Sequence, residues 1–237
     1  MKLILTCEHG GNRLPPEYQY LFQNHPQVLQ THKGFDLGSL DLFLHLSSLA
    51  TFQKSNQISR LLVELNRSLH HPDLFSDYAK HLPVIEKKQI LEQYYHIYRG
   101  KIKEQIHSNL DQNNVVLHLS VHTFTPILNG AVRQCDIGIL YDPSRSIEKW
   151  YAKNLKQALL ERKPALNVRY NYPYRGVSDG FTKTLRKDFI KNYIGIELEI
   201  NQKYVSNNQL DSKLKKVIFK AIQESLQQKF FEPSSLF

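Results

Sequence analysis

The sequence contains little cysteine, little glycine or proline, and no long apolar run. Its two cysteines among 237 residues, Cys7 and Cys135, are too few for a disulfide scaffold and favour a reducing cytoplasm. Ten glycines and ten prolines, beside 41% hydrophobic residues, exclude a collagen-like or disordered chain. Apolar runs such as Val115–Val121, which His118 interrupts, are far shorter than the about 20 residues of a membrane span. Because the apolar start Met1–Cys7 is also too short for a signal peptide, we expect no membrane association.

Blocks of like charge and nucleotide-binding loops are also missing. Thirty-one Lys and Arg against 22 Asp and Glu give a formal net charge of +9, which attracts anions. The charges are scattered, without a run of five basic residues, so a generally basic surface is as good an explanation as an anionic ligand. There is no Gly-x-Gly-x-x-Gly, Walker or Gly-x-Ser-x-Gly sequence. We therefore expect a small-molecule partner and no nucleic acid, and the sequence predicts no particular oligomeric state.

Short apolar runs alternate with helical patterns along the chain. This alternation predicts a largely parallel sheet with helices on both faces. Since no repeat or flexible linker separates the elements, we expect one α/β domain over residues 1–237. Strands are predicted over Lys2–Cys7, Ser59–Leu65, Val115–Val121, Asp136–Tyr141, Val168–Tyr170 and Tyr193–Ile200, and helices over Leu37–Leu49, Glu86–Leu110, Ile147–Leu160, Asp179–Ile190 and Leu210–Gln227.

Polar side chains stand at the ends of four predicted strands, where ligands bind in open α/β sheets. Two histidines and a carboxylate there suit a zinc ion with an open position for water, and a further carboxylate could act as general base. Each histidine taken alone could instead cap a loop. His118 shares a strand face with His122 and is predicted to be a core histidine. The polar residues at the strand ends are Glu8, His9, Asn66, Arg67, His122, Glu197, Glu199 and Asn201.

Six short segments spread over nearly the whole chain carry a recognisable pattern. They are Cys7-Glu8-His9-Gly10-Gly11-Asn12 with Leu14-Pro15, Gly34-Phe35-Asp36-Leu37-Gly38, Ser59-Arg60-Leu61 through Asn66-Arg67, His122-Thr123-Phe124-Thr125-Pro126, Asn171-Tyr172-Pro173-Tyr174-Arg175-Gly176, and Glu197-Leu198-Glu199-Ile200. Each segment alone is weak evidence. Together, in this order, they resemble the N-formylglutamate amidohydrolase family, with Thr123 where the family has serine.

This resemblance implies both a fold and an activity. The fold would be similar to that of zinc carboxypeptidases, a three-layer α/β/α sandwich around a mixed, mostly parallel sheet. The activity would be zinc-dependent hydrolysis of N-formyl-L-glutamate, or a similar N-acyl amino acid, to the free amino acid and formate or another acid. Two alternatives stay open: a carboxypeptidase-like peptidase acting on peptides or cell-wall fragments, and a non-catalytic binding protein.

The resemblance also assigns roles at the site. His9 and His122 correspond to the two histidine ligands of one zinc ion. Zinc carboxypeptidases have a glutamate three residues after the first histidine, where this chain has Asn12, so the third ligand must come from elsewhere. Asp36 matches the family's aspartate and is our first choice, and Glu8 is the second. Neighbouring side chains on an extended chain point apart, which argues against Glu8 beside His9.

The remaining roles concern proton transfer and substrate binding. Glu199 is expected to be the general base, with Glu197 held further back by an arginine or backbone amides. Arginine binds carboxylates through two parallel hydrogen bonds, so Arg60, Arg67 and Arg175, together with Asn66, are the candidates for holding the substrate. At the two ends of the predicted strand, Arg60 and Arg67 would lie about 20 Å apart, which favours Arg67. Each arginine could instead form a surface salt bridge.

Overall fold

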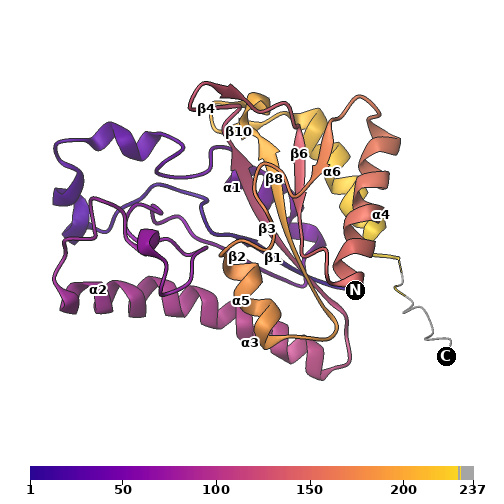
Figure 1. Ribbon diagram of the computed structural model, residues 1–237, viewed down its shortest axis with the longest axis horizontal. Helices are drawn as coiled ribbons and strands as arrows, with labels where there is room; N and C mark the ends of the chain where they lie inside the picture. Colours follow the sequence, from indigo (N-terminus) through magenta and orange to yellow (C-terminus); the bar gives the residue numbers. More distant parts are fainter. Residues whose placement is uncertain (229, 231–237) are drawn as a thin grey trace.

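A six-stranded mixed sheet forms the centre of the protein in the computed structural model, which describes residues 1–228 and 230 (Figure 1). β6 runs antiparallel to β8, and every other pair of neighbouring strands is parallel. The predicted mixed, mostly parallel sheet is therefore confirmed. The strand order is β2 (Phe52–Ser55), β1 (Lys2–Cys7), β3 (Val116–Phe124), β8 (Tyr193–Asn201), β6 (Ile137–Leu140) and β7 (Val168–Tyr170).

Helices cover both faces of this sheet and complete the predicted three layers. One face packs on α1 (Ser39–Leu46), α4 (Ser146–Arg162) and α6 (Ser212–Ser225), and the other on α3 (Ile97–Asp111) and α5 (Phe181–Asp188). α2 (Val84–Ile90) continues through a π-helical turn, Leu91–His96, into α3. In Figure 1 these three segments form one long helix beneath the sheet. Short 3₁₀ turns cover Pro16–Phe22, Pro26–Gln30, Ser47–Leu49, Pro72–Leu74 and Gln202–Tyr204.

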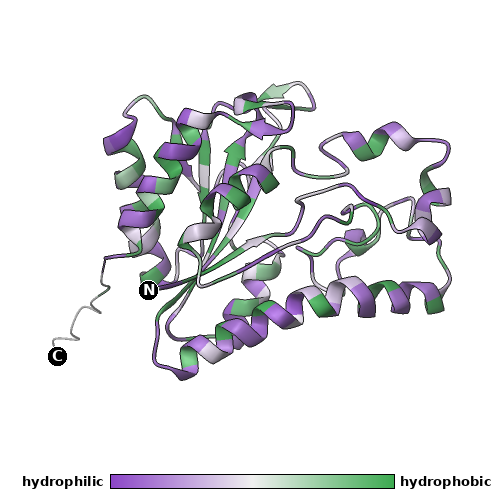
Figure 2. Ribbon diagram, turned by 180° about the vertical axis from the view of Figure 1, so that it is seen from behind, coloured by the Kyte–Doolittle hydropathy of each residue, from purple (hydrophilic) through white to green (hydrophobic). Residues whose placement is uncertain are grey.

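Strict alternation of side chains along the central strands separates an apolar face from a polar one. Leu117, Leu119 and Val121 of β3 join the core cluster under α1, α4 and α6, as the alternate residues of β1 and β8 do. His118 and His122 point to the opposite face because they are offset by one residue from this set. Figure 2 shows the central strands largely in green and much purple along the long helix. The sequence therefore places its strand-borne polar groups on the α3 side of the sheet.

The predicted strand Ser59–Leu65 is wrong: this segment is a series of turns. Leu62, Val63 and Leu65 are buried, as expected for apolar side chains. They lie outside the sheet, in the core cluster that α3 and α5 form on one of its faces. Besides the local turn bond from the amide of Leu62 to Ser59 O, backbone bonds also leave the segment: the amide of Ser59 donates to Arg13 O and that of Glu64 to Leu74 O. A short apolar run has the same composition in a buried turn as in a buried strand, so periodicity cannot separate the two.

The edge strand β2 and two small hairpins were not predicted. One hairpin joins β4 (Ile127–Leu128) to β5 (Ala131–Val132), and the other joins β9 (Val205–Ser206) to β10 (Gln209–Leu210). The first turns through Asn129 and Gly130, whose φ angles of 49° and 79° are those of a tight two-residue hairpin turn.

The predicted domain over 1–237 includes residues 229 and 231–237, which lie outside the described residues. Within the part that is described, no helix combines the length and the apolar character needed to cross a bilayer.

Candidate active site

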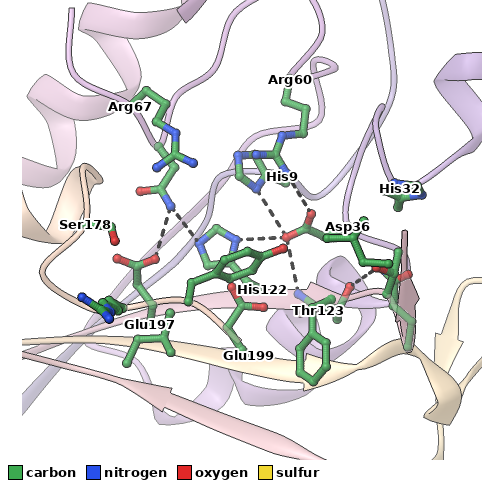
Figure 3. A pocket seen from close by; sticks show the side chains of 18 of the residues that line it. His9, His32, Asp36, Arg60, Arg67, His122, Thr123, Ser178, Glu197 and Glu199 are labelled. Atoms are coloured by element: carbon green, nitrogen blue, oxygen red, sulfur yellow. Dashed lines mark hydrogen bonds and ion pairs between the residues drawn. The ribbon is translucent and has the colours of Figure 1, made fainter. Parts of the chain in front are cut away.

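A cavity of about 440 Å³ lies at the carboxyl ends of β1, β3 and β8 (Figure 3). This is the edge of the sheet where ligands of open α/β folds bind. Eight of the residues that the sequence analysis proposed for metal binding, proton transfer or substrate binding line this cavity: His9, Asp36, Arg60, Asn66, Arg67, His122, Arg175 and Glu199. Glu8, the second choice of ligand, is fully buried and is not among the lining residues.

His9, Asp36 and His122 form one compact group at the bottom of the cavity. Nδ1 of His122 lies 3.0 Å, and Nδ1 of His9 3.3 Å, from Oδ2 of Asp36. The two imidazole rings are 4.9 Å apart between centroids, and the three potential ligand atoms lie within 4.8 Å of one another. The backbone amide of Asp36 donates to His9 O over 3.0 Å, which brings the two residues together across 27 positions of sequence.

This group fits a catalytic zinc ion in its donor set. Two imidazole nitrogens and one carboxylate oxygen are the protein ligands of several zinc hydrolase sites, with a fourth position left for water. Here both histidines present the same atom, Nδ1, to the shared Asp36 oxygen. A single ion could therefore contact all three side chains, and these residues could hold a metal.

The other ring nitrogen of each histidine, Nε2, points away from Asp36 and also has polar partners. Nε2 of His9 lies 2.5 Å from Oε1 of Glu64. Nε2 of His122 lies 2.8 Å from the Ser120 hydroxyl and 3.3 Å from Oε2 of Glu8. Glu8 thus stands on the far side of the His122 ring from Asp36, so the geometry favours Asp36 over Glu8 as a third ligand.

Opposite charges compensate one another in this buried group. Burial alone opposes ionisation of Glu8, yet His122 and the other neighbours lower its pKa to about 2. Arg60 and His9 likewise lower the pKa of Glu64 against the effect of burial. Burial disfavours the charged form of His122, but its contacts with Asp36 and Glu8 raise its pKa well above the usual value. The carboxylates therefore require positive charge close by, which a bound divalent cation would provide.

Glu199 differs from the buried acids Glu8, Asp36 and Glu64 because one of its carboxylate oxygens has no partner among the described residues. It is the register partner of His122 across β3 and β8, and its Oε2 atom is buried without a hydrogen-bond partner among the described residues. Burial raises the pKa of Glu199 to about 7. A carboxylate that takes up and releases a proton near neutral pH is suited to general-base catalysis.

Glu197, two residues earlier, is held in place by other groups. Its carboxylate accepts a 2.6 Å hydrogen bond from the Thr182 hydroxyl and a 3.3 Å bond from Nδ2 of Asn66. The expectation that an arginine or backbone amides would hold Glu197 is therefore wrong. A hydroxyl and a side-chain amide do so, because the start of α5 and the Asn66 turn meet above β8.

A glycine in β6 allows a loop to close beside Glu199. A Cβ atom at Gly138 would lie 1.9 Å from the carbonyl oxygen of Tyr172 and 3.2 Å from Cβ of Glu199. The Asn171 side chain fixes the same loop by accepting hydrogen bonds from the amides of Tyr141 and Gly176. The loop then carries Tyr174 and Arg175 to the cavity wall.

The three candidate arginines differ in how their guanidinium groups are used. Arg60 contacts Glu64 through Nε at 2.7 Å and Asp36 through a terminal nitrogen at 3.3 Å. Arg67 donates to the carbonyl oxygen of Asp179, and Arg175 is exposed, with no side-chain hydrogen bond to a described residue. The expected separation of Arg60 and Arg67 along a strand is wrong, because the chain turns between them and both line the cavity (Figure 3).

Sequence analysis missed Glu64 and Ser120, which contact the Nε2 atoms of the histidines. Glu64 did leave a signal, since it is the one charged residue within the apolar run Leu61–Leu65. Such an acid is expected to be paired if the run is buried. Other residues on the cavity wall carried no comparable signal: His32, Ser178, Asp179 and Gln202.

Fold and site together define an α/β protein with a buried histidine–aspartate–histidine group that could hold a metal ion. Residues 1–206 match the family model of N-formylglutamate amidohydrolase, and the chain belongs to this family. The resemblance seen in the six sequence segments is thereby confirmed. The family name denotes a hydrolase of amide bonds.

Two solved structures share the fold over nearly the whole chain. A gene product of Agrobacterium tumefaciens is 23% identical, with 95% of this chain and 90% of that chain covered and a TM-score of 0.76. An N-formylglutamate amidohydrolase from Ralstonia eutropha JMP134 is 16% identical, with 94% and 93% covered and a TM-score of 0.75. A metallo-carboxypeptidase from Burkholderia cenocepacia reaches a TM-score of only 0.39, too low to support an argument. No curated protein sequence matches the chain.

Proposed function

We propose that the protein is a zinc-dependent amidohydrolase that cleaves the amide of N-formyl-L-glutamate or a similar N-acyl amino acid. The observation that carries this proposal is the presence of His9, Asp36 and His122 beside the incompletely paired acid Glu199 in one cavity. Membership of the N-formylglutamate amidohydrolase family supports the same reaction class. The products would be the free amino acid and formate, or the corresponding acid.

His9, Asp36 and His122 would hold the zinc ion, which when bound lowers the pKa of water and polarises a carbonyl oxygen. Glu199 accepts the proton of the attacking water through its buried carboxylate. The water oxygen bonds to the carbonyl carbon, and Glu199 passes its proton to the amide nitrogen as the C–N bond breaks. The amine then leaves neutral, and the acyl group leaves as the carboxylic acid, which loses its proton to the solvent to give formate or the corresponding anion. Glu197 keeps its contacts with Thr182 and Asn66 and stays out of this transfer.

Arg67 and Arg175 are the proposed carboxylate-binding residues. Both line the cavity, and the guanidinium group of each has donors free for a ligand. Arg60 contacts Glu64 and Asp36, so we assign it mainly to holding these acids in place. Asn66, between Glu64 and Arg67, would orient the substrate through an amide that already reaches towards His122 at 3.5 Å.

We further propose a cytoplasmic setting and one domain for the whole chain. The cytoplasm is supported by Cys7 and Cys135, which are both buried and free. Thiols persist in this form in a reducing compartment.

A hydrolysis screen tests the proposed function. Zinc-loaded protein is incubated with N-formyl, N-acetyl and N-succinyl amino acids, and release of the free amino acid is followed. We expect turnover of at least one dicarboxylic substrate, its loss after chelation and its return with zinc. Glu199→Gln serves as the control, because it should bind zinc and still fail to turn over. Absence of hydrolysis by protein that has bound one zinc per chain would reject the proposal.

A further inference from the structure

One buried carboxylate, that of Glu64, contacts three separate residues of the site. Its Oε1 atom lies 2.5 Å from Nε2 of His9 and accepts a 2.9 Å hydrogen bond from the backbone amide of Asn66. Its Oε2 atom accepts a 2.7 Å hydrogen bond from Nε of Arg60 and lies 2.5 Å from a terminal nitrogen of the same guanidinium as an ion pair. Only 5% of Glu64 is exposed, so water does not replace these contacts.

We propose that Glu64 is the positioning residue of this site, through which the orientation of His9 is coupled to that of Arg60 and Asn66. The inference rests on the proposed function in one respect, namely that a metal ion binds between His9, Asp36 and His122. It goes beyond that function because it assigns a role to a residue that touches neither the metal nor the substrate.

The tautomer of His9 follows from the contact with Glu64. An ionised carboxylate has only acceptor atoms, so the imidazole nitrogen that faces it must carry a proton. Nε2–H of His9 then donates to Glu64, and Nδ1 turns its lone pair towards Asp36 and the metal position. Partners of this kind fix the ring orientation of a metal-binding histidine and increase its basicity.

The same carboxylate fixes the turn that carries the substrate-binding side chains. The bond from Asn66 N to Glu64 holds the backbone of Asn66, whose Oδ1 atom accepts a 2.7 Å bond from the amide of Phe181. Asn66 Nδ2 in turn reaches Glu197 at 3.3 Å. Loss of the Glu64 charge should therefore loosen His9, Arg60 and Asn66 together.

His122 is oriented by a different arrangement, which gives an internal comparison. Its Nε2 atom is closest to the Ser120 hydroxyl, at 2.8 Å, and Glu8 is further away at 3.3 Å. Glu8 makes no contact with Arg60 or Asn66 among the hydrogen bonds of the described residues. A change at Glu8 should thus affect metal binding without disturbing the substrate-binding turn.

The experiment measures zinc affinity and substrate affinity separately in Glu64→Gln and Glu64→Leu. Glutamine can still accept from His9, but its NH₂ group would then face the donors of Arg60. Leucine removes every polar contact. Zinc affinity is measured by chelator competition on folded, metal-free protein, and KM and kcat on protein saturated with zinc. Glu148→Gln is the matched control, since Glu148 is fully buried and ion-paired to Arg186 on α5.

We expect zinc binding to weaken by about 10- to 100-fold in Glu64→Leu, the usual effect of removing the partner of a metal-binding histidine. Glu64→Gln should lose less zinc affinity but should still raise KM, because Arg60 and Asn66 move. Glu148→Gln should lower thermal stability and leave zinc affinity unchanged. Zinc affinity within about threefold of the wild-type value in folded Glu64→Leu would overturn the inference.

A measurement on the wild-type protein keeps the inference testable if both variants fail to fold. The ¹⁵N chemical shifts of the His9 ring in zinc-loaded protein should identify a protonated Nε2 and a metal-bound Nδ1. The reverse assignment would overturn the role of Glu64, even if the protein hydrolyses its substrate. Failure of the wild-type protein to bind zinc would reject the metal-dependent function itself, so the two failures are distinguishable.

Discussion

His122 on β3 and Glu199 on β8 are direct register partners in adjacent parallel strands, and both side chains line the same cavity. Ser120 and Glu197 form the next pair on the same face, two residues earlier in each strand. The sheet thus fixes the distance between a potential metal ligand and a potential base by backbone pairing alone. Sites built on neighbouring strands in this way are more rigid than sites on loops.

The role of Glu199 as proton acceptor predicts a specific defect in Glu199→Gln. Glutamine keeps the size and shape of the side chain but cannot accept the proton. We expect kcat to fall by about 10²- to 10⁴-fold, the usual contribution of general-base catalysis, while zinc binding stays close to normal. Steady-state kinetics and zinc content on the same preparation measure both.

Glu197→Gln is the matched control for this prediction. It changes the neighbouring acid on the same strand face, which is already bonded to Thr182 and Asn66, so kcat should fall much less. Full activity of Glu199→Gln together with loss of activity in Glu197→Gln would exchange the two roles.

Asp36→Asn tests the third metal ligand. The change removes the charge that faces Nδ1 of both histidines and keeps the volume of the side chain. Because Asp36 would contact the ion directly, we expect zinc affinity to fall by more than the about 10- to 100-fold typical of an outer partner. Asp41→Asn on α1, which breaks the ion pair with Lys215, should leave zinc affinity unchanged. Zinc binding that survives in Asp36→Asn and is lost in Glu8→Gln would make Glu8 the ligand.

The part of the site that lies on strands could be predicted, because successive side chains of a strand alternate between the two faces of the sheet. His118 and His122 share one face of β3, and Glu197 and Glu199 share one face of β8, as an extended chain requires. His118 is also buried and hydrogen-bonded as a core histidine, in agreement with its interpretation from sequence.

The part that lies on loops depends on contacts between distant segments, which periodicity does not report. Asp36 reaches the histidines through a backbone bond to His9, and it was selected only through the family resemblance. The apolar run around Glu64 predicts a strand although it forms turns, because burial in a turn and burial in a strand require the same side chains. Asn129-Gly130, by contrast, is a sequence typical of a two-residue hairpin turn, which the structure contains.

The proposed binding of a substrate carboxylate predicts a KM effect in Arg67→Ala and Arg175→Ala. A hydrogen bond to a charged group contributes about 1.5–3 kcal/mol, so each change should raise KM for a dicarboxylic substrate by about 10- to 100-fold. The value of kcat should change little, because the contact is present in ground state and transition state alike. Arg162→Ala on α4, where Arg162 pairs with Glu224, should leave KM unchanged. Wild-type kcat/KM in both variants would make Arg67 and Arg175 structural.

The last prediction concerns stability and pH, and it follows from the burial of His118. This histidine is fully buried, with Nε2 2.9 Å from the Thr6 hydroxyl and Nδ1 2.8 Å from the Tyr193 hydroxyl. Burial lowers its pKa from 6.5 to about 4. Above pH 6.5 the ring is neutral in both folded and unfolded chains, so no penalty arises. As the pH falls below 6.5 the unfolded chain takes up a proton that the folded protein refuses, and stability is lost until about pH 4.

Comparison of the wild-type protein with His118→Gln isolates this contribution. At pH 8 the variant should be the less stable protein, because it loses packing and a hydrogen bond in the core. At pH 5 the wild-type protein is also destabilised because folded His118 resists protonation. The difference in free energy of unfolding between the two proteins should therefore shrink by about 2 kcal/mol. Tyr193→Phe keeps the imidazole and should retain the full pH dependence of the wild-type protein. Urea unfolding of the metal-free proteins at the two pH values measures these differences. If the difference in free energy of unfolding is the same at pH 8 and pH 5, His118 can be protonated without unfolding.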